Sequence, residues 1–134
     1  MLQKKDINKI VKYWSELSDY DFETALAMQE TGRFLYVGFM CHQSVEKLLK
    51  AYYSAKIKET PPHIHSLSRL AEQSELLQKM NESQLNTIDA LEPLNIEARY
   101  PSYKGNLIRS LNKSKCQTLL NETKALTEWI KQQL

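Results

Sequence analysis

The chain has 134 residues, 42% of them hydrophobic, and its 18 Lys+Arg against 16 Asp+Glu give a formal net charge of +2. This length fits one domain over residues 1–134, and the near-balanced charge excludes a generic DNA-coating protein. The chain has only three glycines and four prolines. Tight β-hairpins and phosphate-binding loops need glycine, so this composition argues against both and favours long helices. We therefore expect an all-α fold, an up-and-down bundle of about five helices.

The N-terminal segment has the apolar spacing of an amphipathic helix, with apolar side chains at Ile7, Ile10, Val11, Trp14 and Leu17. A second apolar phase runs from Phe22 to Gln29, and Ser18 or Asp19 is suited to cap it. The pattern is compatible with one bent helix or with two coaxial pieces. In either case Gly32 is a natural residue to end the segment.

Residues 33–56 carry the clearest helical pattern, with apolar residues at Val37, Cys41, Val45, Leu48 and Tyr52. So apolar a helix is expected at the centre of the bundle. Gly38 in its interior costs about 1 kcal/mol relative to alanine, which indicates that another helix approaches closely there. Pro61 and Pro62 follow the helix and prevent it from continuing.

Shorter helices are expected in the second half of the chain. Ser66 is a candidate N-cap for a helix reaching Leu77, and Asn81 or Ser83 begins another that Pro93 bends or ends. Leu94 and Ile96 continue the pattern briefly, and residues 99–112 are predicted to be irregular. The last helix begins near residue 113 and is expected to bury Cys116, Leu119, Leu120, Thr123, Leu126 and Ile130, with Trp129 at its flank.

Cysteine and histidine usage limits the chemistry of the chain. Cys41 and Cys116 lie in helical patterns without disulfide or metal spacing, which favours a reducing compartment, so we expect a cytoplasmic protein. His63 and His65 have no cysteine partner at ligand spacing, and we expect neither a metal nor a cofactor. The first twenty residues lack the features of a signal peptide, and no segment has the roughly 20 apolar residues that span a bilayer. We therefore expect no membrane partner.

One edge of the central helix is polar. His42, Glu46 and Lys50 follow one another at steps of four residues, so their side chains share an edge on which Glu46 can pair with Lys50. The structural interpretation is a half-buried polar seam, and the functional one is a site for a base edge or a phosphate. His65, just before the candidate cap, is expected to form a hydrogen bond across its turn.

Charged side chains gather in three groups along the sequence. One basic cluster is Lys47, Lys50, Lys56 and Lys58, and a second is Lys104, Arg109, Lys113 and Lys115. The second adjoins a predicted helix N-terminus, which favours anions, and Tyr100 and Tyr103 beside it are suited to stack on a nucleobase. A solvated basic loop is the alternative. Residues 15–32 carry acidic side chains but no basic one, a pattern suited either to complementary self-association or to a solvated face.

Three sequence stretches resemble the HEPN domain family: FMCHQSVEKLLKAY at residues 39–52, PPHIHSL at 61–67 and EARYP at 97–101. The resemblance covers essentially the whole chain and implies a bundle of four or five helices, commonly homodimeric. It also implies nucleotide or RNA binding and partnership with a minimal nucleotidyltransferase in a toxin–antitoxin-like pair. On this interpretation, the expected ligand residues are His42, Glu46, Lys47, Lys50, Arg99, Tyr100, Tyr103 and Lys104.

Many members of this family are metal-independent RNases in which an arginine is followed, after four to six residues, by a histidine. Arg99 is instead followed at those positions by Lys104, Gly105 and Asn106, and no histidine occurs after His65. We therefore expect no catalytic residues of this kind and favour the binding branch of the family. Two alternatives remain: an RNase with a non-standard site that pairs His42 or His65 with Arg99, and a structural dimerisation module.

Overall fold

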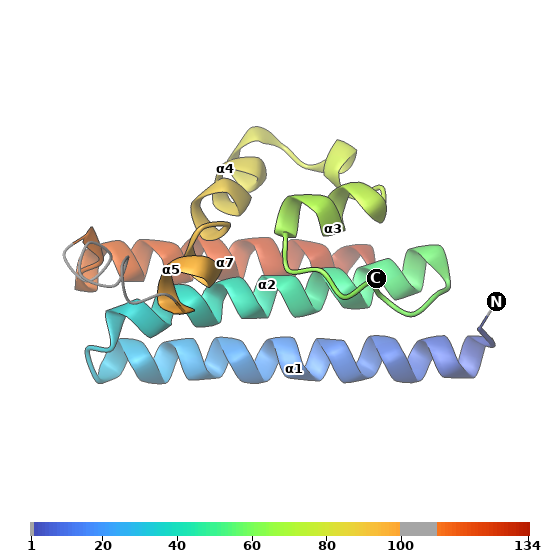
Figure 1. Cartoon of the computed structure of the whole chain (residues 1–134), viewed down its shortest axis with the longest axis horizontal. Helices are drawn as coiled ribbons and strands as arrows, with labels where there is room; N and C mark the ends of the chain where they lie inside the picture. The colour runs from blue at the N-terminus through green and yellow to red at the C-terminus, as the bar shows by residue number, and fades with distance from the viewer. Residues whose placement is uncertain (1, 100–109) are drawn as a thin grey trace.

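The computed structural model describes residues 2–99 and 110–134, with the backbone alone at residues 97–99. Every regular element in these ranges is helical. Helices α1 (Lys4–Glu30) and α2 (Phe34–Ile57) form a long antiparallel pair, and α7 (Lys113–Gln133) packs along α2 (Figure 1). The all-α helical fold predicted from the sequence is confirmed.

Helix α1 is continuous through both of its apolar phases. Ser18 is buried within it and does not cap a second helix. Its hydroxyl donates to the Ser44 carbonyl at 2.7 Å, and the Ser44 hydroxyl donates to the Ser18 carbonyl at 2.9 Å. The helix ends at Glu30, and Gly32 just beyond it has the left-handed φ of 73° that terminates a helix, as expected from the sequence. The amides of Gly32 and Arg33 bond back to Gln29 and Met28, a Schellman arrangement that satisfies the last carbonyls.

Helix α2 is the central element of the bundle. It contacts α1, α3, α4, α5 and α7, and the apolar positions predicted to face the core are all buried: Val37, Cys41, Val45, Leu48 and Tyr52. A Cβ at Gly38 would lie 2.9 Å from Leu94 Cδ1. The close approach predicted at Gly38 is therefore confirmed, and the helix that packs there is α5 (Leu94–Arg99).

Three further elements join α2 to α5, on the side of α2 away from α1 (Figure 1). They are α3 (Leu67–Gln73), the 3₁₀ turn η1 (Leu77–Lys79) and α4 (Glu82–Leu91). The single helix predicted up to Leu77 is wrong, because α3 ends at Gln73 and Glu75 adopts a left-handed φ of 66°. Asn81, not Ser83, caps α4, and its side chain forms a reciprocal capping box with Gln84.

Helix α7 begins as predicted, at Lys113, because the Asn112 side chain accepts a hydrogen bond from the Lys115 amide. All six residues expected to be buried on its inner face are buried: Cys116, Leu119, Leu120, Thr123, Leu126 and Ile130. Most of the stretch predicted to be irregular, residues 99–112, lies outside the described residues. No helix in the described ranges is long and apolar enough to cross a bilayer.

Candidate ligand site on the central helix

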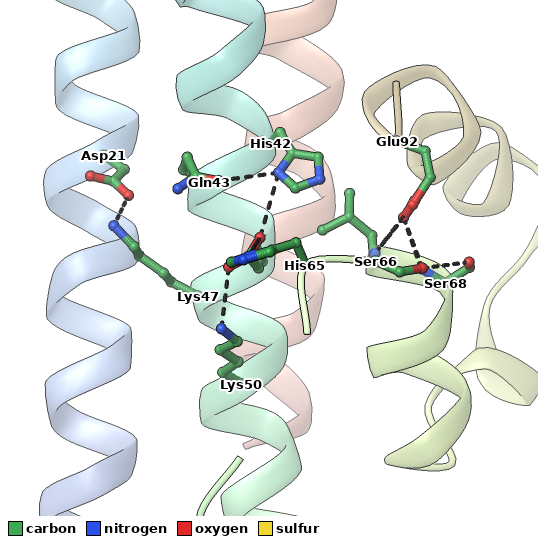
Figure 2. Close-up of polar contacts among 11 residues, drawn as sticks. Asp21, His42, Gln43, Lys47, Lys50, His65, Ser66, Ser68 and Glu92 are labelled. Atoms are coloured by element: carbon green, nitrogen blue, oxygen red, sulfur yellow. Dashed lines mark hydrogen bonds and ion pairs between the residues drawn. The ribbon is translucent and has the colours of Figure 1, made fainter. Parts of the chain in front are cut away.

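The predicted polar seam is centred on Glu46 of α2, whose side chain is only 4% exposed. Lys50 Nζ lies 3.2 Å from Glu46 Oε2, which confirms the predicted pairing. His65 Nδ1 lies 3.2 Å from the same oxygen, and His42 Nδ1 lies 3.8 Å from Oε1 (Figure 2). A buried carboxylate thus gathers three nitrogen-bearing side chains, and we call these four residues the Glu46 cluster: His42, Glu46, Lys50 and His65.

His65 is the member of the cluster that reaches solvent, with 57% of its side chain exposed. An ionised carboxylate only accepts hydrogen bonds, so Nδ1 of His65 must carry the hydrogen directed at Glu46. That bond fixes the tautomer of the neutral ring and leaves Nε2 as its other functional atom. The hydrogen bond expected across the turn of His65 is wrong in its acceptor, because the imidazole reaches Glu46 on α2 instead.

A second carboxylate holds the chain next to His65. Glu92, at the end of α4, accepts hydrogen bonds from the backbone amides of Leu67 and Ser68 and from the Ser66 hydroxyl (Figure 2). These contacts satisfy free amides at the start of α3, where a negative charge is favoured by the helix dipole. Glu46 therefore holds the ring of His65, and Glu92 holds the chain immediately after it.

The side chain of Lys50 is buried rather than exposed to solvent. Its side chain is 8% exposed, and Nζ lies 5.1 Å from the centre of the Trp14 ring on α1 as well as beside Glu46. The carboxylate and the aromatic face both attract the ammonium group. A phosphate contact from Lys50, as predicted, would have to compete with these two partners.

Lys47 is not part of the Glu46 cluster. It points from α2 toward α1, where Nζ lies 2.5 Å from Oδ2 of the buried Asp21 (Figure 2). A step of one residue turns a helix by about 100°, so neighbouring positions face different surroundings. The structure therefore separates Lys47 from the other three predicted residues of the central helix.

The predicted corner is described only in part. Arg99 is the last residue of α5, and the first residue of α5, Leu94, packs over Gly38, one helical turn from His42. Helix α5, which contains Arg99, therefore packs on α2, the helix that carries most of the Glu46 cluster. Tyr100, Tyr103 and Lys104 lie outside the described residues.

Metal and thiol chemistry find no support in the part of the chain that the structure describes. No group of three or more His, Cys, Asp or Glu side chains there is placed to hold a metal ion. Cys41 and Cys116 are free and buried, and burial raises the pKa of the Cys41 thiol to about 12. A protonated, buried thiol is a poor nucleophile. Within the Glu46 cluster, His65 is the one exposed side chain, whereas His42, Glu46 and Lys50 are buried.

These features define a class of protein: an all-α bundle whose central helix carries a buried carboxylate holding an exposed histidine. The HEPN domain model matches residues 11–133. The chain belongs to the HEPN domain family. The fold is also similar to the crystal structure of TT1696 from Thermus thermophilus, with a TM-score of 0.79 at 17% identity over 92% of this chain and 98% of that one. No curated protein matches the chain.

Reasoning from the sequence missed four contributors to this region: Trp14, Asp21, the contact of His65 with Glu46, and Glu92. Asp21 and Trp14 lie on α1, whose register against α2 is not visible in the helical period alone. His65 carried a signal, because it precedes the Ser66 cap within the PPHIHSL stretch. Glu92 precedes Pro93. This position indicates a helix end but says nothing about the α3 amides that Glu92 accepts from.

Proposed function

We propose that the protein is a nucleotide-binding and partner-binding HEPN module without RNase activity, one domain that acts as a homodimer with a minimal nucleotidyltransferase in a toxin–antitoxin-like pair. The observation that carries the nucleotide-binding part is the Glu46 cluster, in which a buried carboxylate holds an exposed histidine. The two free, buried cysteines support a reducing, cytoplasmic location.

The free-energy cost of burying the charges of the Glu46 cluster favours a functional role. Taking a carboxylate and an ammonium out of water costs several kcal/mol per ion, and well-packed apolar residues often replace such pairs without loss of stability. Glu46 and Lys50 are both nearly inaccessible to solvent. Ionisable groups kept in such surroundings, with one partner open to a ligand, are frequent at functional sites.

The geometry suits recognition of a phosphate or a base edge by His65. Nδ1 is occupied by Glu46, so Nε2 is available to accept a hydrogen bond when the ring is neutral and to donate one when it is protonated. Arg99 would supply a phosphate contact, with Lys104 beside it and with Tyr100 and Tyr103 stacking on the base. The packing of α5 on α2 at Gly38 supports a shared site for the two groups.

Calorimetric titration with ATP, GTP and a short single-stranded RNA tests this site. We expect binding to the wild-type protein, and at least a tenfold loss of affinity in His65→Ala and Arg99→Ala. His63→Ala is the matched control, because His63 is also exposed and lies two residues away outside the cluster. No binding of any of these ligands at millimolar concentration, or equal losses in His63→Ala and His65→Ala, would refute the nucleotide site.

The nucleotidyltransferase part of the proposal rests on membership of the HEPN family. The adjacent open reading frame is the direct place to look for the partner. We expect it to encode a minimal nucleotidyltransferase that co-purifies with this protein when the two are expressed together. An unrelated neighbour, or a nucleotidyltransferase that elutes separately, would remove this part and leave the ligand site untouched.

One observation favours a second candidate function, a non-standard RNase. An imidazole held through Nδ1 by a buried carboxylate is the arrangement that prepares a histidine to act as a general base through Nε2. In such a site His65 would take the proton of a ribose 2′-hydroxyl, and Arg99 would stabilise the phosphorane charge. Cleavage of labelled RNA by the wild-type protein, lost in both His65→Ala and Arg99→Ala, would establish this function in place of binding alone.

A further inference from the structure

The outer face of α1 combines two exposed tyrosines with charges that are segregated along the helix. Tyr13 and Tyr20 are 58% and 68% exposed and lie seven residues apart, which places them on one stripe of the helix. The opposite side of α1 packs on α2, and no other described element covers the stripe (Figure 1). Two large exposed aromatic side chains on one stripe provide the kind of amphipathic contact surface that protein–protein interfaces favour.

Charge along the same stripe changes sign at its middle. The half of α1 before Tyr13 carries exposed basic residues, and the half after it carries exposed acidic ones. On the stripe itself the basic residues are Lys5 and Lys9, and the acidic ones are Glu16, Glu23 and Glu30. Of the exposed charges beside the stripe, Lys12 pairs with Glu16 and Asp19 pairs with Lys131 of α7. Residues 15–32 contain no basic side chain at all. A second copy of this helix in antiparallel orientation is therefore complementary to the first.

We propose that the outer face of α1 is a self-association surface on which two copies of the chain pack through antiparallel α1 helices. A twofold axis midway between Tyr13 and Tyr20 sets Tyr13 of one copy beside Tyr20 of the other. The same symmetry brings Lys9 near Glu23 of the second copy and Lys5 near Glu30, each within about one helical turn. Every such contact occurs twice, because the twofold axis repeats it.

The residue nearest the axis is already neutralised within its own chain. Glu16 would meet its own copy across the axis, and a bare pair of carboxylates there would repel. Lys12 Nζ lies 3.8 Å from Glu16 Oε1 in the same helix, so each copy brings its counter-ion with it. The two tyrosine pairs therefore flank the axis and supply the apolar part of the proposed contact.

The size of the surface sets the strength expected of the association. Helix α1 has 27 residues and is about 40 Å long and about 10 Å wide, so two such helices bury about 800 Å² in total. This is below the usual size of a stable interface. We therefore expect a weak, reversible dimer that salt dissociates, because much of the attraction comes from exposed charges.

The α1 surface would be the contact through which the proposed homodimer forms, so this inference rests on the homodimer part of the proposed function. It does not depend on the Glu46 cluster. Sedimentation velocity over a range of protein concentrations, at low and at high salt, measures the dimer. We expect concentration-dependent dimerisation at low salt, and loss of the dimer in the Tyr13→Ser/Tyr20→Ser double variant. These side chains are exposed, so the double variant should retain the helical circular dichroism of the wild type.

Charge reversals test the antiparallel direction. Lys9→Glu and Glu23→Lys should each weaken dimerisation about tenfold, because each places like charges together at two symmetric contacts. An equimolar mixture of the two variants should regain wild-type affinity, as should the Lys9→Glu/Glu23→Lys double variant. Asp89→Lys, an equally large charge change on exposed α4, is the matched control and should behave as the wild type.

Two results would overturn the proposed surface. One is a wild-type protein that stays monomeric at every concentration in low salt, and the other is a dimer that none of the α1 variants changes. Calorimetry with nucleotide on the same variants separates the two proposals. Intact ligand binding with no dimer refutes the α1 surface together with the homodimer part of the proposed function. A dimer that none of the α1 variants changes refutes the α1 surface alone, and a dimer that binds no ligand refutes the nucleotide site alone.

Discussion

Two ion pairs of α2 involve neighbouring residues, Glu46 and Lys47, yet they lie in different surroundings. Glu46 is paired with Lys50 of its own helix and with a loop histidine that is 57% exposed. Lys47 is paired with Asp21 of α1 and joins two packed helices. The first arrangement ends in an exposed imidazole, and the second ends on a neighbouring helix. A charged pair can therefore link helices or present a side chain, depending on which helix face it occupies.

The largest difference between the two pairs should appear when the acid is removed. Glu46→Ala leaves the 8%-exposed Lys50 without its carboxylate, and we expect a loss of about 3–5 kcal/mol in the free energy of unfolding. Asp21→Ala should lose less, about 1–2 kcal/mol, because Lys47 is 20% exposed and reaches water more readily. Urea unfolding measures both. Equal losses would mean that the two pairs are equally closed.

A smaller effect is expected when the Glu46–Lys50 pair is replaced as a unit. In Glu46→Leu/Lys50→Met both buried charges are removed together, and the stability in urea should lie within about 1 kcal/mol of the wild type or above it. Nucleotide affinity in calorimetry should nevertheless fall at least tenfold, because His65 loses its acceptor. The matched replacement Asp21→Leu/Lys47→Met should leave nucleotide affinity unchanged. Full affinity in the first variant would show that the Glu46 cluster serves the fold only.

The smallest effect concerns the thiol on the same helix. Burial raises the pKa of Cys41 to about 12, so its thiol stays protonated and unreactive at neutral pH and gains reactivity only as the pH approaches that value. In a Cys116→Ser background, we expect iodoacetamide to alkylate Cys41 only through opening of the bundle. Glu46→Ala should speed this reaction more than Asp21→Ala does. Rapid alkylation of the folded wild-type protein at neutral pH would contradict the burial of Cys41.

Much of the fold is predictable because helical periodicity is a local property of the sequence. The boundaries of α2 and α7, the end of α1 at Gly32 and the close contact at Gly38 all follow from side-chain spacing and backbone chemistry. The break between α3 and η1 does not. Glu75 adopts a left-handed φ without being glycine, and no residue type in the sequence signals this turn.

The candidate site is less predictable, because its contacts join residues far apart in the chain. The i,i+4 spacing of His42, Glu46 and Lys50 predicted one edge of the Glu46 cluster correctly. The same spacing rule cannot say that His65 approaches from a loop 19 residues away. It also cannot say that Lys47 turns to Asp21, 26 residues earlier. Contacts of this kind depend on how helices are placed against one another.

The reciprocal bonds between Ser18 and Ser44 fix the sliding position of α1 against α2. Both hydroxyls are buried, and a shift of α1 by one helical turn, about 5.4 Å, would leave both without partners. The two hydrogen bonds therefore oppose sliding of α1 along α2. Motions within the bundle are accordingly expected to carry α1 and α2 together as one rigid hairpin.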